Sequence, residues 1–327
     1  MTPALDVRAM LVTAGFGTRL APLTDVLPKP AVPVANRPLA WFALDHLYRS
    51  GVRELVLNTH HLATELERAL NPLAPPDLEL DYVFEPEILG TGGGIRNAWG
   101  KPRAGETFLV MNGKYVFAPD LAAALRAHRE HDAIATMVLT HAPDTRGFGD
   151  VEIDAEGWVR RFRRTPPRAA GEPALRPMFY TGISLLSERA FPELPDRGCL
   201  IGDAYQHWIA RGERVLGVVD GDVCRDAGIS IWHYWEANQA LLRGEVRWPG
   251  IEPSAEAVLC AADVARGAGV TIERSAIGAG ATLAAGVRLE DAVVWPGAEV
   301  TFDAIRCIVL PSGVRVEVPH LPLTASA

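Results

Sequence analysis

The chain has 327 residues, of which 48% are hydrophobic and 22% charged, and its formal net charge at pH 7 is −8. This composition is typical of one large or two modest globular domains, and the acidic balance argues against a general binder of nucleic acid or membrane surfaces, which needs a cationic face. No apolar stretch approaches the ~20 residues of a membrane span, and no secretory signal is predicted. The four cysteines have no CxxC spacing, so we expect a reducing, cytoplasmic location without a disulfide framework or a structural zinc site.

The first part of the chain alternates short apolar runs with helical patterns. Buried strands are predicted at 7–13, 54–58, 78–84 and 107–111, with helices between them at 38–50, 61–70 and 93–99. This alternation indicates βαβ units, and hence an α/β fold with a Rossmann-like, mostly parallel sheet flanked by helices. Sheets of this kind bind ligands at the carboxyl ends of their strands.

The middle of the chain continues the same domain. A helix is predicted at 119–131, a strand at 133–140, a strand-rich segment at 148–186, and further helices at 201–210 and 231–243. Two prolines within 248–253 then interrupt the chain. We therefore predict that the first domain comprises residues 1–245.

From residue 263 the sequence becomes a series of short units with an aliphatic residue at every sixth position, such as Ile277, Leu283 and Leu289. This spacing is typical of hexapeptide repeats and predicts a short left-handed parallel β-helix over residues 255–318; a glycine-rich β-meander is the alternative. The repeats fill only the last fifth of the chain, which argues against a hexapeptide acyltransferase. We expect them to pack on the first domain or on a second subunit of a homo-oligomer.

The most informative stretch follows the first strand. It reads Thr13-Ala14-Gly15-Phe16-Gly17-Thr18-Arg19-Leu20 and continues to Pro28-Lys29-Pro30. Small residues after a strand let backbone N–H groups approach a phosphate, and Thr18, Arg19 and Lys29 add donors and positive charge. The Walker lysine pattern and the third glycine of a dinucleotide fingerprint are absent. The stretch thus predicts a cradle for a nucleoside triphosphate, with a plain strand-to-helix turn as the alternative.

This stretch resembles the sugar-1-phosphate nucleotidyltransferases, the family of mannose-1-phosphate guanylyltransferases, glucose-1-phosphate thymidylyltransferases and N-acetylmuramate-1-phosphate uridylyltransferases. The family pattern GxGTRLxPLTxxxPKP is matched from Gly15 to Pro30 without a gap. The similarity continues through Glu85-Pro86-Glu87-Ile88-Leu89-Gly90-Thr91-Gly92-Gly93, Asn112-Gly113, Tyr180-Thr181-Gly182-Ile183 and Arg225-Asp226-Ala227-Gly228. It spans about residues 7–243.

The resemblance implies an enzyme that joins a nucleoside triphosphate and a sugar-1-phosphate into an NDP-sugar and releases pyrophosphate. Because two polyanions must meet, catalysis would consist mainly of positioning and charge neutralisation. The resemblance implies catalytic roles for Arg19, Lys29 and Asp226, and a Mg²⁺ ion bound by Asp226. The nucleotide-binding residues implied are Ala14, Gly15, Gly17, Thr18, Glu85, Gly90, Thr91 and Lys114; the sugar-phosphate residues implied are Gly149, Arg164 and Gly182.

Two positions depart from the family pattern. A second metal-binding Asp is expected at position 114, but the sequence has Lys114, whose ammonium cannot coordinate Mg²⁺ and is expected beside Asp226. The family's Glu-Lys-Pro is replaced by a stretch containing Arg164, which could anchor the phosphate although the carboxylate for the sugar hydroxyls is missing. We therefore expect a weak or altered Mg²⁺ site. The alternative is a regulatory homologue that binds a nucleotide or NDP-sugar without turnover, and the sequence leaves both the sugar and the base open.

Overall fold

The computed structural model describes residues 5–141, 150–167, 171, 173–221 and 224–319. Contacts group the chain into two compact units, neither of them continuous in sequence. Unit 1 comprises residues 1–15, 40–113 and 117–224, and unit 2 comprises residues 16–39, 114–116 and 225–327. The predicted domain boundaries, 1–245 and 255–318, divide the chain along its sequence and remain a prediction.

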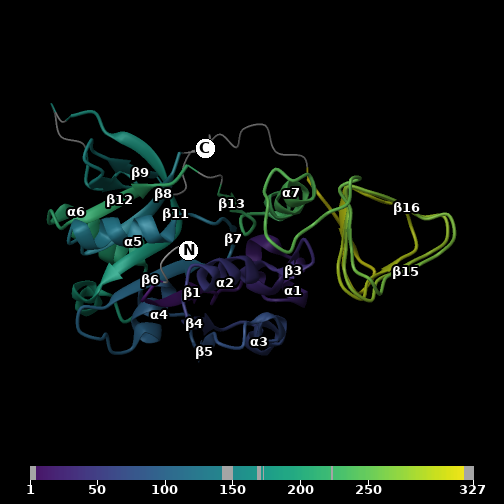
Figure 1. Cartoon of the computed structure of the whole chain (residues 1–327), viewed down its shortest axis with the longest axis horizontal. Coiled ribbons are helices and arrows are strands. Elements are labelled where there is room, and N and C mark those ends of the chain that lie inside the picture. The colour runs from purple at the N-terminus through teal and green to yellow at the C-terminus, as the bar shows by residue number, and fades with distance from the viewer. Residues whose placement is uncertain (1–4, 142–149, 168–170, 172, 222–223, 320–327) are drawn as a thin grey trace. The chain divides into compact units, whose positions relative to one another are not determined.

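Unit 1 is built on a mixed sheet of nine strands among the described residues (Figure 1). In sheet order the main path is β10 (Val159–Phe162), β9 (Asp150–Ile153), β11 (Arg176–Ser187), β6 (Thr107–Asn112), β1 (Arg8–Val12), β4 (Glu54–Thr59) and β5 (Glu79–Phe84). Off this path, β8 (Ala135–Thr140) pairs with β11, and β12 (Val215–Val219) pairs with β8. Strands β6, β1, β4 and β5 run parallel, whereas β11 is antiparallel to its neighbours. The predicted parallel-rich α/β sheet is confirmed.

Helices flank this sheet. They are α2 (Leu39–Arg49), α3 (Ala63–Leu70), α4 (Gly90–Trp99), α5 (Leu121–Glu130) and α6 (Gln206–Ala210), with shorter helical turns η3 (Asn71–Leu73), η4 (Glu188–Glu193) and η5 (Leu200–Tyr205). Helix α4 packs on β1 and β4, and α5 packs on β8, β11 and β12. The core between them holds large buried side chains such as Trp99, Phe108 and Trp208. The predicted helices are confirmed, although α4 begins three residues earlier than expected, at Gly90.

Before its C-terminal part, unit 2 consists of several short elements and one longer helix. These are η1 (Thr18–Leu20), α1 (Leu23–Val26), η2 (Lys29–Ala31), the hairpin of β2 (Pro33–Val34) and β3 (Arg37–Pro38), the pair of β7 (Tyr115–Val116) and β13 (Arg225–Asp226), and α7 (Ile231–Leu242). The side chain of Ser230 caps α7 by accepting the backbone N–H of His233. No helix in the described ranges is long and apolar enough to cross a membrane.

The C-terminal part of unit 2, residues 258–309, is named the repeat segment. Its strands stack in three parallel sheets: β14 (Leu259–Cys260), β17 (Ala276–Ile277), β20 (Val293–Val294) and β23 (Cys307–Val309); β15 (Ala265–Arg266), β18 (Thr282–Leu283) and β21 (Glu299–Val300); and β16 (Thr271–Glu273), β19 (Arg288–Glu290) and β22 (Ala304–Ile305). Leu259 pairs with Ala276 and Ala276 with Val293, so partners lie 17 residues apart. β24 (Arg315–Glu317) closes the first sheet by pairing antiparallel with β23.

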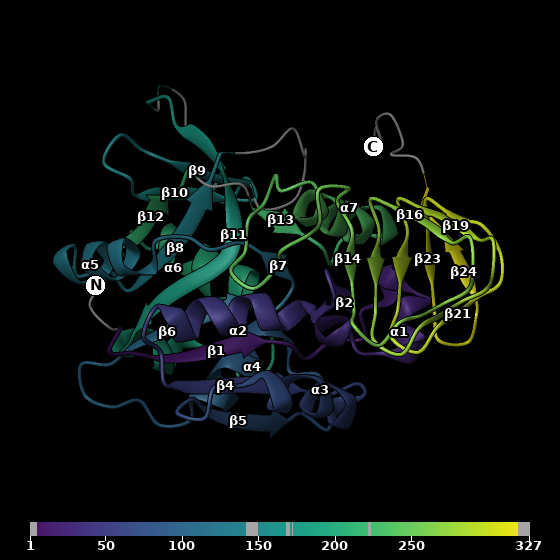
Figure 2. The same ribbon diagram turned by 45° about the vertical axis from the view of Figure 1, so that its right-hand side comes forward.

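The stacked coils enclose a core of their own. Ile277, Leu283, Leu289 and Val294 are among its buried side chains. Figure 1 shows the three-sided outline of the coils, and Figure 2 shows them from the side with their strands next to one another. The aliphatic residues at every sixth position thus point inward, one from each side of the outline. This arrangement fits the predicted parallel β-helix, whose handedness remains a prediction.

Candidate functional site

In unit 1 a buried polar network joins the carboxyl ends of β1 and β4. Asn58, near the end of β4, accepts hydrogen bonds at its Oδ1 from the backbone N–H groups of Thr13 at 2.8 Å and Ala14 at 3.3 Å. Its Nδ2 donates to Oε1 of Glu85 at 2.7 Å. This network fixes the start of the predicted phosphate cradle, which includes Ala14 and Gly15, relative to the sheet.

Glu85 is buried directly after β5, at the turn that leads into α4. It is 1% exposed, and its second oxygen, Oε2, accepts the backbone N–H of Leu89 at 2.9 Å. Because both carboxylate oxygens are bonded to the protein, Glu85 holds the turn that leads into α4. Leu89 is the residue directly before α4, so this bond lies at the start of the helix. A Cβ atom at Gly94 would lie 2.8 Å from both Asn58 Nδ2 and Glu85 Oε1, so this network requires glycine at position 94.

The glycine-rich turn at the start of α4 packs against a segment around Gly198. Gly90 has a positive φ of 78°, and a Cβ there would lie 2.4 Å from the carbonyl oxygen of Gly198. The same carbonyl accepts the N–H of Gly92 at 2.9 Å, and Thr91, which is exposed, accepts the N–H of Leu200 at its Oγ1. The N–H of Gly92 is therefore bonded within the protein.

Unit 2 contains the second half of the predicted cradle. Gly17 has a φ of 67°, and a Cβ at this position would lie 2.8 Å from Thr24 Cγ2 and 3.0 Å from Lys29 Cβ. The Thr24 hydroxyl donates to the carbonyl of Gly17 at 3.2 Å. The turn therefore packs directly against the stem of Lys29, while Thr18 and Arg19 are exposed.

Lys114 and Asp226 are brought together by the antiparallel pairing of β7 and β13. The Lys114 ammonium forms an ion pair with Asp226 Oδ2, and Asp226 Oδ1 accepts the backbone N–H of Gly228 at 2.9 Å. The Lys114 side chain is 25% exposed and that of Asp226 8%. The Nζ atom of Lys114 also lies 4.6 Å from the ring centroid of Tyr115. Both oxygens of the predicted metal ligand are thus already bonded to the protein.

Lys29 belongs to the same electrostatic group. The pKa of Lys29 is lowered to about 8, mainly by burial and also by the positive charges of Lys114 and Arg19, against the opposing effect of Asp226. We name Arg19, Lys29 and Lys114, together with Asp226, the cation group. The group has three basic side chains and one carboxylate, so its net charge attracts anions.

The predicted sugar-phosphate residues lie in unit 1. Gly182, with a φ of 76°, is on β11 where its register with β8 shifts between Tyr180 and Ile183. Arg164, with a φ of 64°, is exposed on a tight turn closed by hydrogen bonds between Phe162 and Thr165. Gly149 lies outside the described residues.

Two contributors were missed by the sequence-based prediction of site residues. Asn58 is a polar residue directly after the apolar run 55–57, and this feature could have marked it. The contact of Gly198 with Gly90 could not be predicted from a local sequence pattern, because the two residues are about a hundred positions apart in the chain. Among the described residues no group of three or more His, Cys, Asp or Glu side chains could hold a metal ion.

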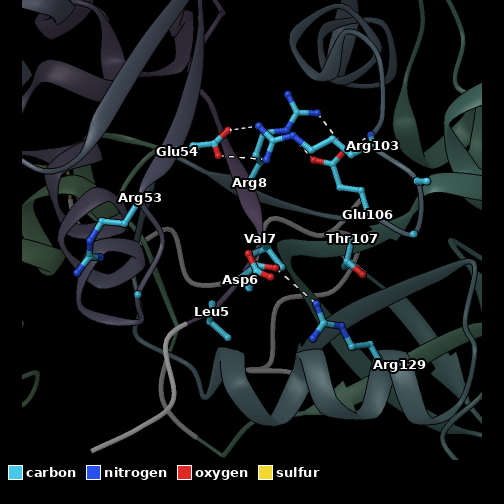
Figure 3. A pocket seen from close by; sticks show the side chains of 13 residues that line it. Leu5, Asp6, Val7, Arg8, Arg53, Glu54, Arg103, Glu106, Thr107 and Arg129 are labelled. Carbon is cyan, nitrogen blue, oxygen red and sulfur yellow. Dashed lines mark hydrogen bonds and ion pairs between the residues drawn. The ribbon is translucent and has the colours of Figure 1, made fainter.

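A cavity of about 420 Å³ lies beside Arg8, Glu54 and Thr107 (Figure 3). These residues are at the amino-terminal ends of strands of unit 1, opposite the carboxyl ends described above. Its arginines are engaged by neighbouring groups. Arg8 pairs with Glu106 at 2.6 Å and Arg103 with Glu54 at 2.7 Å. These ion pairs connect strand ends and loops, and the cavity contains none of the predicted site residues.

The parallel-rich sheet defines an α/β protein, and Lys29 of the cation group lies in a Pro-Lys-Pro loop. The nucleotidyl transferase family model matches residues 8–244. The chain therefore belongs to the sugar-1-phosphate nucleotidyltransferase family.

Several curated proteins are similar to the chain. A mannose-1-phosphate guanylyltransferase of Mycobacterium tuberculosis is 30% identical over 303 residues, covering 90% of this chain and 81% of that protein. A UTP–glucose-1-phosphate uridylyltransferase of Synechocystis sp. is 30% identical over 263 residues, covering 75% and 67%. An N-acetylmuramate alpha-1-phosphate uridylyltransferase of Caulobacter vibrioides is 30% identical over 255 residues, covering 73% and 96%.

Solved structures share the fold. The crystal structure of HddC from Yersinia pseudotuberculosis, complexed with GMP-PN, superimposes with a TM-score of 0.59. It covers 71% of this chain and 98% of that protein at 22% sequence identity. This likeness supports the α/β architecture of the chain.

Proposed function

We propose that the protein transfers a nucleotidyl group from a nucleoside triphosphate to a sugar-1-phosphate. A phosphate oxygen of the sugar-1-phosphate attacks the α-phosphorus, the bond from that phosphorus to the bridging oxygen breaks, and pyrophosphate leaves. The observation that carries the proposal is the cation group, which lies within the segment matched by the family and can neutralise two polyanions. The names of the similar proteins support the same reaction class.

The residues of the cradle are assigned to the triphosphate. Arg19, exposed beside the Gly17 turn, clamps phosphate oxygens with its planar fork and stabilises charge at the α-phosphorus. Lys29 neutralises the phosphates as a compact cation. Backbone N–H groups of the stretch from Ala14 to Thr18 complete the cradle.

The remaining predicted residues are assigned to the base and the sugar. Thr91, exposed at the start of α4, is the candidate for contact with the base, and Gly90 allows the turn its shape. Glu85 acts as a positioning residue through Leu89. On the sugar side, Arg164 anchors the phosphate.

The residues present do not fit a resident Mg²⁺ ion. Such an ion needs several oxygen ligands in near-octahedral geometry. Position 114 offers an ammonium, and both oxygens of Asp226 already accept hydrogen bonds, one from Lys114 and one from the Gly228 N–H. We therefore assign neutralisation of the phosphates to the side-chain cations.

The repeat segment and the location of the protein complete the proposal. We propose that the repeat segment is a left-handed hexapeptide β-helix that supports a homo-oligomer, which light scattering of the purified chain would test. We also propose a reducing, cytoplasmic location, because the four cysteines have no CxxC spacing.

The reaction is tested by pyrophosphate release from a panel of nucleoside triphosphates combined with a panel of sugar-1-phosphates. The expected result is turnover for at least one pair and detection of the matching NDP-sugar by mass spectrometry. If the protein is folded and binds a nucleotide but no pair gives a product, the proposed enzymatic activity is contradicted. That outcome would favour a regulatory homologue, the second candidate, for which the engaged oxygens of Asp226 are the specific observation.

A further inference from the structure

The chain uses lysine very sparingly. Of its 32 lysine and arginine residues, only three are lysines, namely Lys29, Lys101 and Lys114. Two of the three lysines belong to the cation group. An ammonium is a compact point charge, whereas a guanidinium is a wide planar fork. Lys29 and Lys114 therefore contribute compact charges to the cation group.

The Lys114 ammonium is held from several sides. Asp226 Oδ2 pairs with it, and the ring of Tyr115 lies 4.6 Å away. Its stem packs against Gly228, where an added Cβ would lie 3.1 Å from Lys114 Cβ and 3.2 Å from its Cδ. The Lys114 carbonyl accepts the N–H of Ala227 at 3.1 Å. Lys114 is thus a cation of fixed position whose side chain remains 25% exposed.

A divalent ion at this position would meet unfavourable charges. Lys29 and Lys114 are both cations, and Arg19 acts on the same group. The single carboxylate has both oxygens engaged, so a metal would have to displace the ammonium. The phosphates of a nucleotide are negatively charged, so they are attracted by the positive charges of the cation group that Asp226 does not compensate.

From this charge arrangement we propose that Lys114, held by Asp226, is a built-in counter-cation, and that the protein binds its nucleotide as the metal-free triphosphate. The ammonium contributes one fixed positive charge to the phosphates. Mg²⁺ competes with the protein for the triphosphate instead of completing the site. This inference rests on the proposed function for the identity of the ligand, a nucleoside triphosphate.

The first test uses metal alone. Binding of Mn²⁺ to the nucleotide-free full chain is followed by electron paramagnetic resonance in the parent and in Lys114→Asp. We expect the parent to bind Mn²⁺ at least about 10-fold more weakly than Lys114→Asp, because the variant replaces a repelling charge with an oxygen ligand. Equal and tight binding to both proteins, abolished by Asp226→Asn, would overturn the inference.

The second test measures the affinity for GTP, UTP and dTTP by calorimetry, with excess EDTA and with excess MgCl₂. The parent should bind its preferred nucleotide at least as tightly in EDTA, whereas Lys114→Asp should lose about 10-fold or more in EDTA and regain affinity with Mg²⁺. Lys101→Asp, which makes the same charge change at an exposed lysine, should behave as the parent. Lys114→Met, which keeps the stem between Gly228 and Tyr115, should lose affinity without any rescue by Mg²⁺.

The outcomes separate this inference from the proposed reaction. Binding of the metal-free nucleotide without turnover of any sugar-1-phosphate would support the role of Lys114 and contradict the proposed enzymatic activity. If the parent binds its nucleotide at least about 10-fold more tightly with MgCl₂ than with EDTA, the proposed role of Lys114 is overturned, whereas the proposed enzymatic activity is not affected. No binding of any nucleotide under either condition would overturn both.

Discussion

The side-chain amide of Asn58 donates to the carboxylate of Glu85 at 2.7 Å, and the two residues are 2% and 1% exposed. Asn58 bonds the backbone after β1, and Glu85 bonds the backbone before α4. One buried pair therefore connects the ends of strands β1, β4 and β5 to the glycine-rich turn. A buried carboxylate is stable in such a place only while its oxygens are hydrogen-bonded.

This relationship predicts a large effect of Glu85→Ala on stability. The side-chain N–H of Asn58 and the backbone N–H of Leu89 would both lose their acceptor, so we expect the free energy of unfolding to fall by about 2–4 kcal/mol. Glu87→Ala is the matched control, because Glu87 is 76% exposed and pairs with the exposed Arg197. It should change the free energy by less than about 0.5 kcal/mol. Urea denaturation would measure both, and equal small losses would contradict the role of the pair.

The elements around this pair were predictable from sequence, but the pair was not. The strand around Asn58 contains the apolar run 55–57, and the strand before Glu85 begins by alternating polar and apolar residues; both are local patterns that periodicity detects. The role of Glu85 depends on Asn58 and Leu89. No local sequence pattern indicates which donor group hydrogen-bonds to each oxygen of the Glu85 carboxylate. The Lys114–Asp226 proximity was expected because the resemblance aligned both positions with one metal site. The packing of Gly90 on Gly198 depends on two distant segments and was not foreseen.

Arg19 offers a test of the phosphate cradle. The residue is exposed, so Arg19→Ala should lower the free energy of unfolding by less than about 0.5 kcal/mol. Loss of charge-assisted hydrogen bonds to phosphate should weaken nucleotide binding by about 1.5–3 kcal/mol, or roughly 10- to 150-fold. Calorimetry with the preferred nucleotide measures the change. Arg68→Ala, at an arginine 70% exposed on α3, serves as control, and an equal affinity of the two variants would argue against a phosphate role for Arg19.

Tyr234 tests how α7 is joined to the repeat segment inside unit 2. Its hydroxyl donates to the carbonyl of Pro33 and accepts the indole N–H of Trp295 at 3.0 Å, with both side chains fully buried. Tyr234→Phe leaves two buried polar groups without a partner, so we expect a loss of about 2–3 kcal/mol in unfolding free energy. Tyr48→Phe removes a hydroxyl that bonds the exposed Asp77 and should have a much smaller effect. Thermal unfolding of the two variants, compared with the parent, decides between these expectations.

His128 predicts how stability depends on pH. It is 3% exposed, and its Nδ1 lies 2.8 Å from the hydroxyl oxygen of Thr136. Burial lowers the pKa of His128 to about 4, with smaller contributions from Arg129 and Arg189 opposed by Asp132. The unfolded chain, with an ordinary histidine pKa of about 6.5, binds the proton first as the pH falls. Stability is therefore lost between about pH 6.5 and pH 4 and is insensitive to this group above that range.

The size of this effect sets the last prediction. For one histidine with these two pKa values, the free energy of unfolding at pH 5 should be about 2 kcal/mol lower than at pH 7. His128→Asn cannot take up the proton, although its shorter side chain lowers stability at both pH values. The loss between pH 7 and pH 5 should therefore be about 2 kcal/mol smaller in this variant than in the parent. His131→Asn, at an exposed histidine three residues further on, should keep the loss of the parent. Urea denaturation at the two pH values measures all three proteins, and the same pH-dependent loss in His128→Asn and in the parent would show that His128 is not held neutral by the fold.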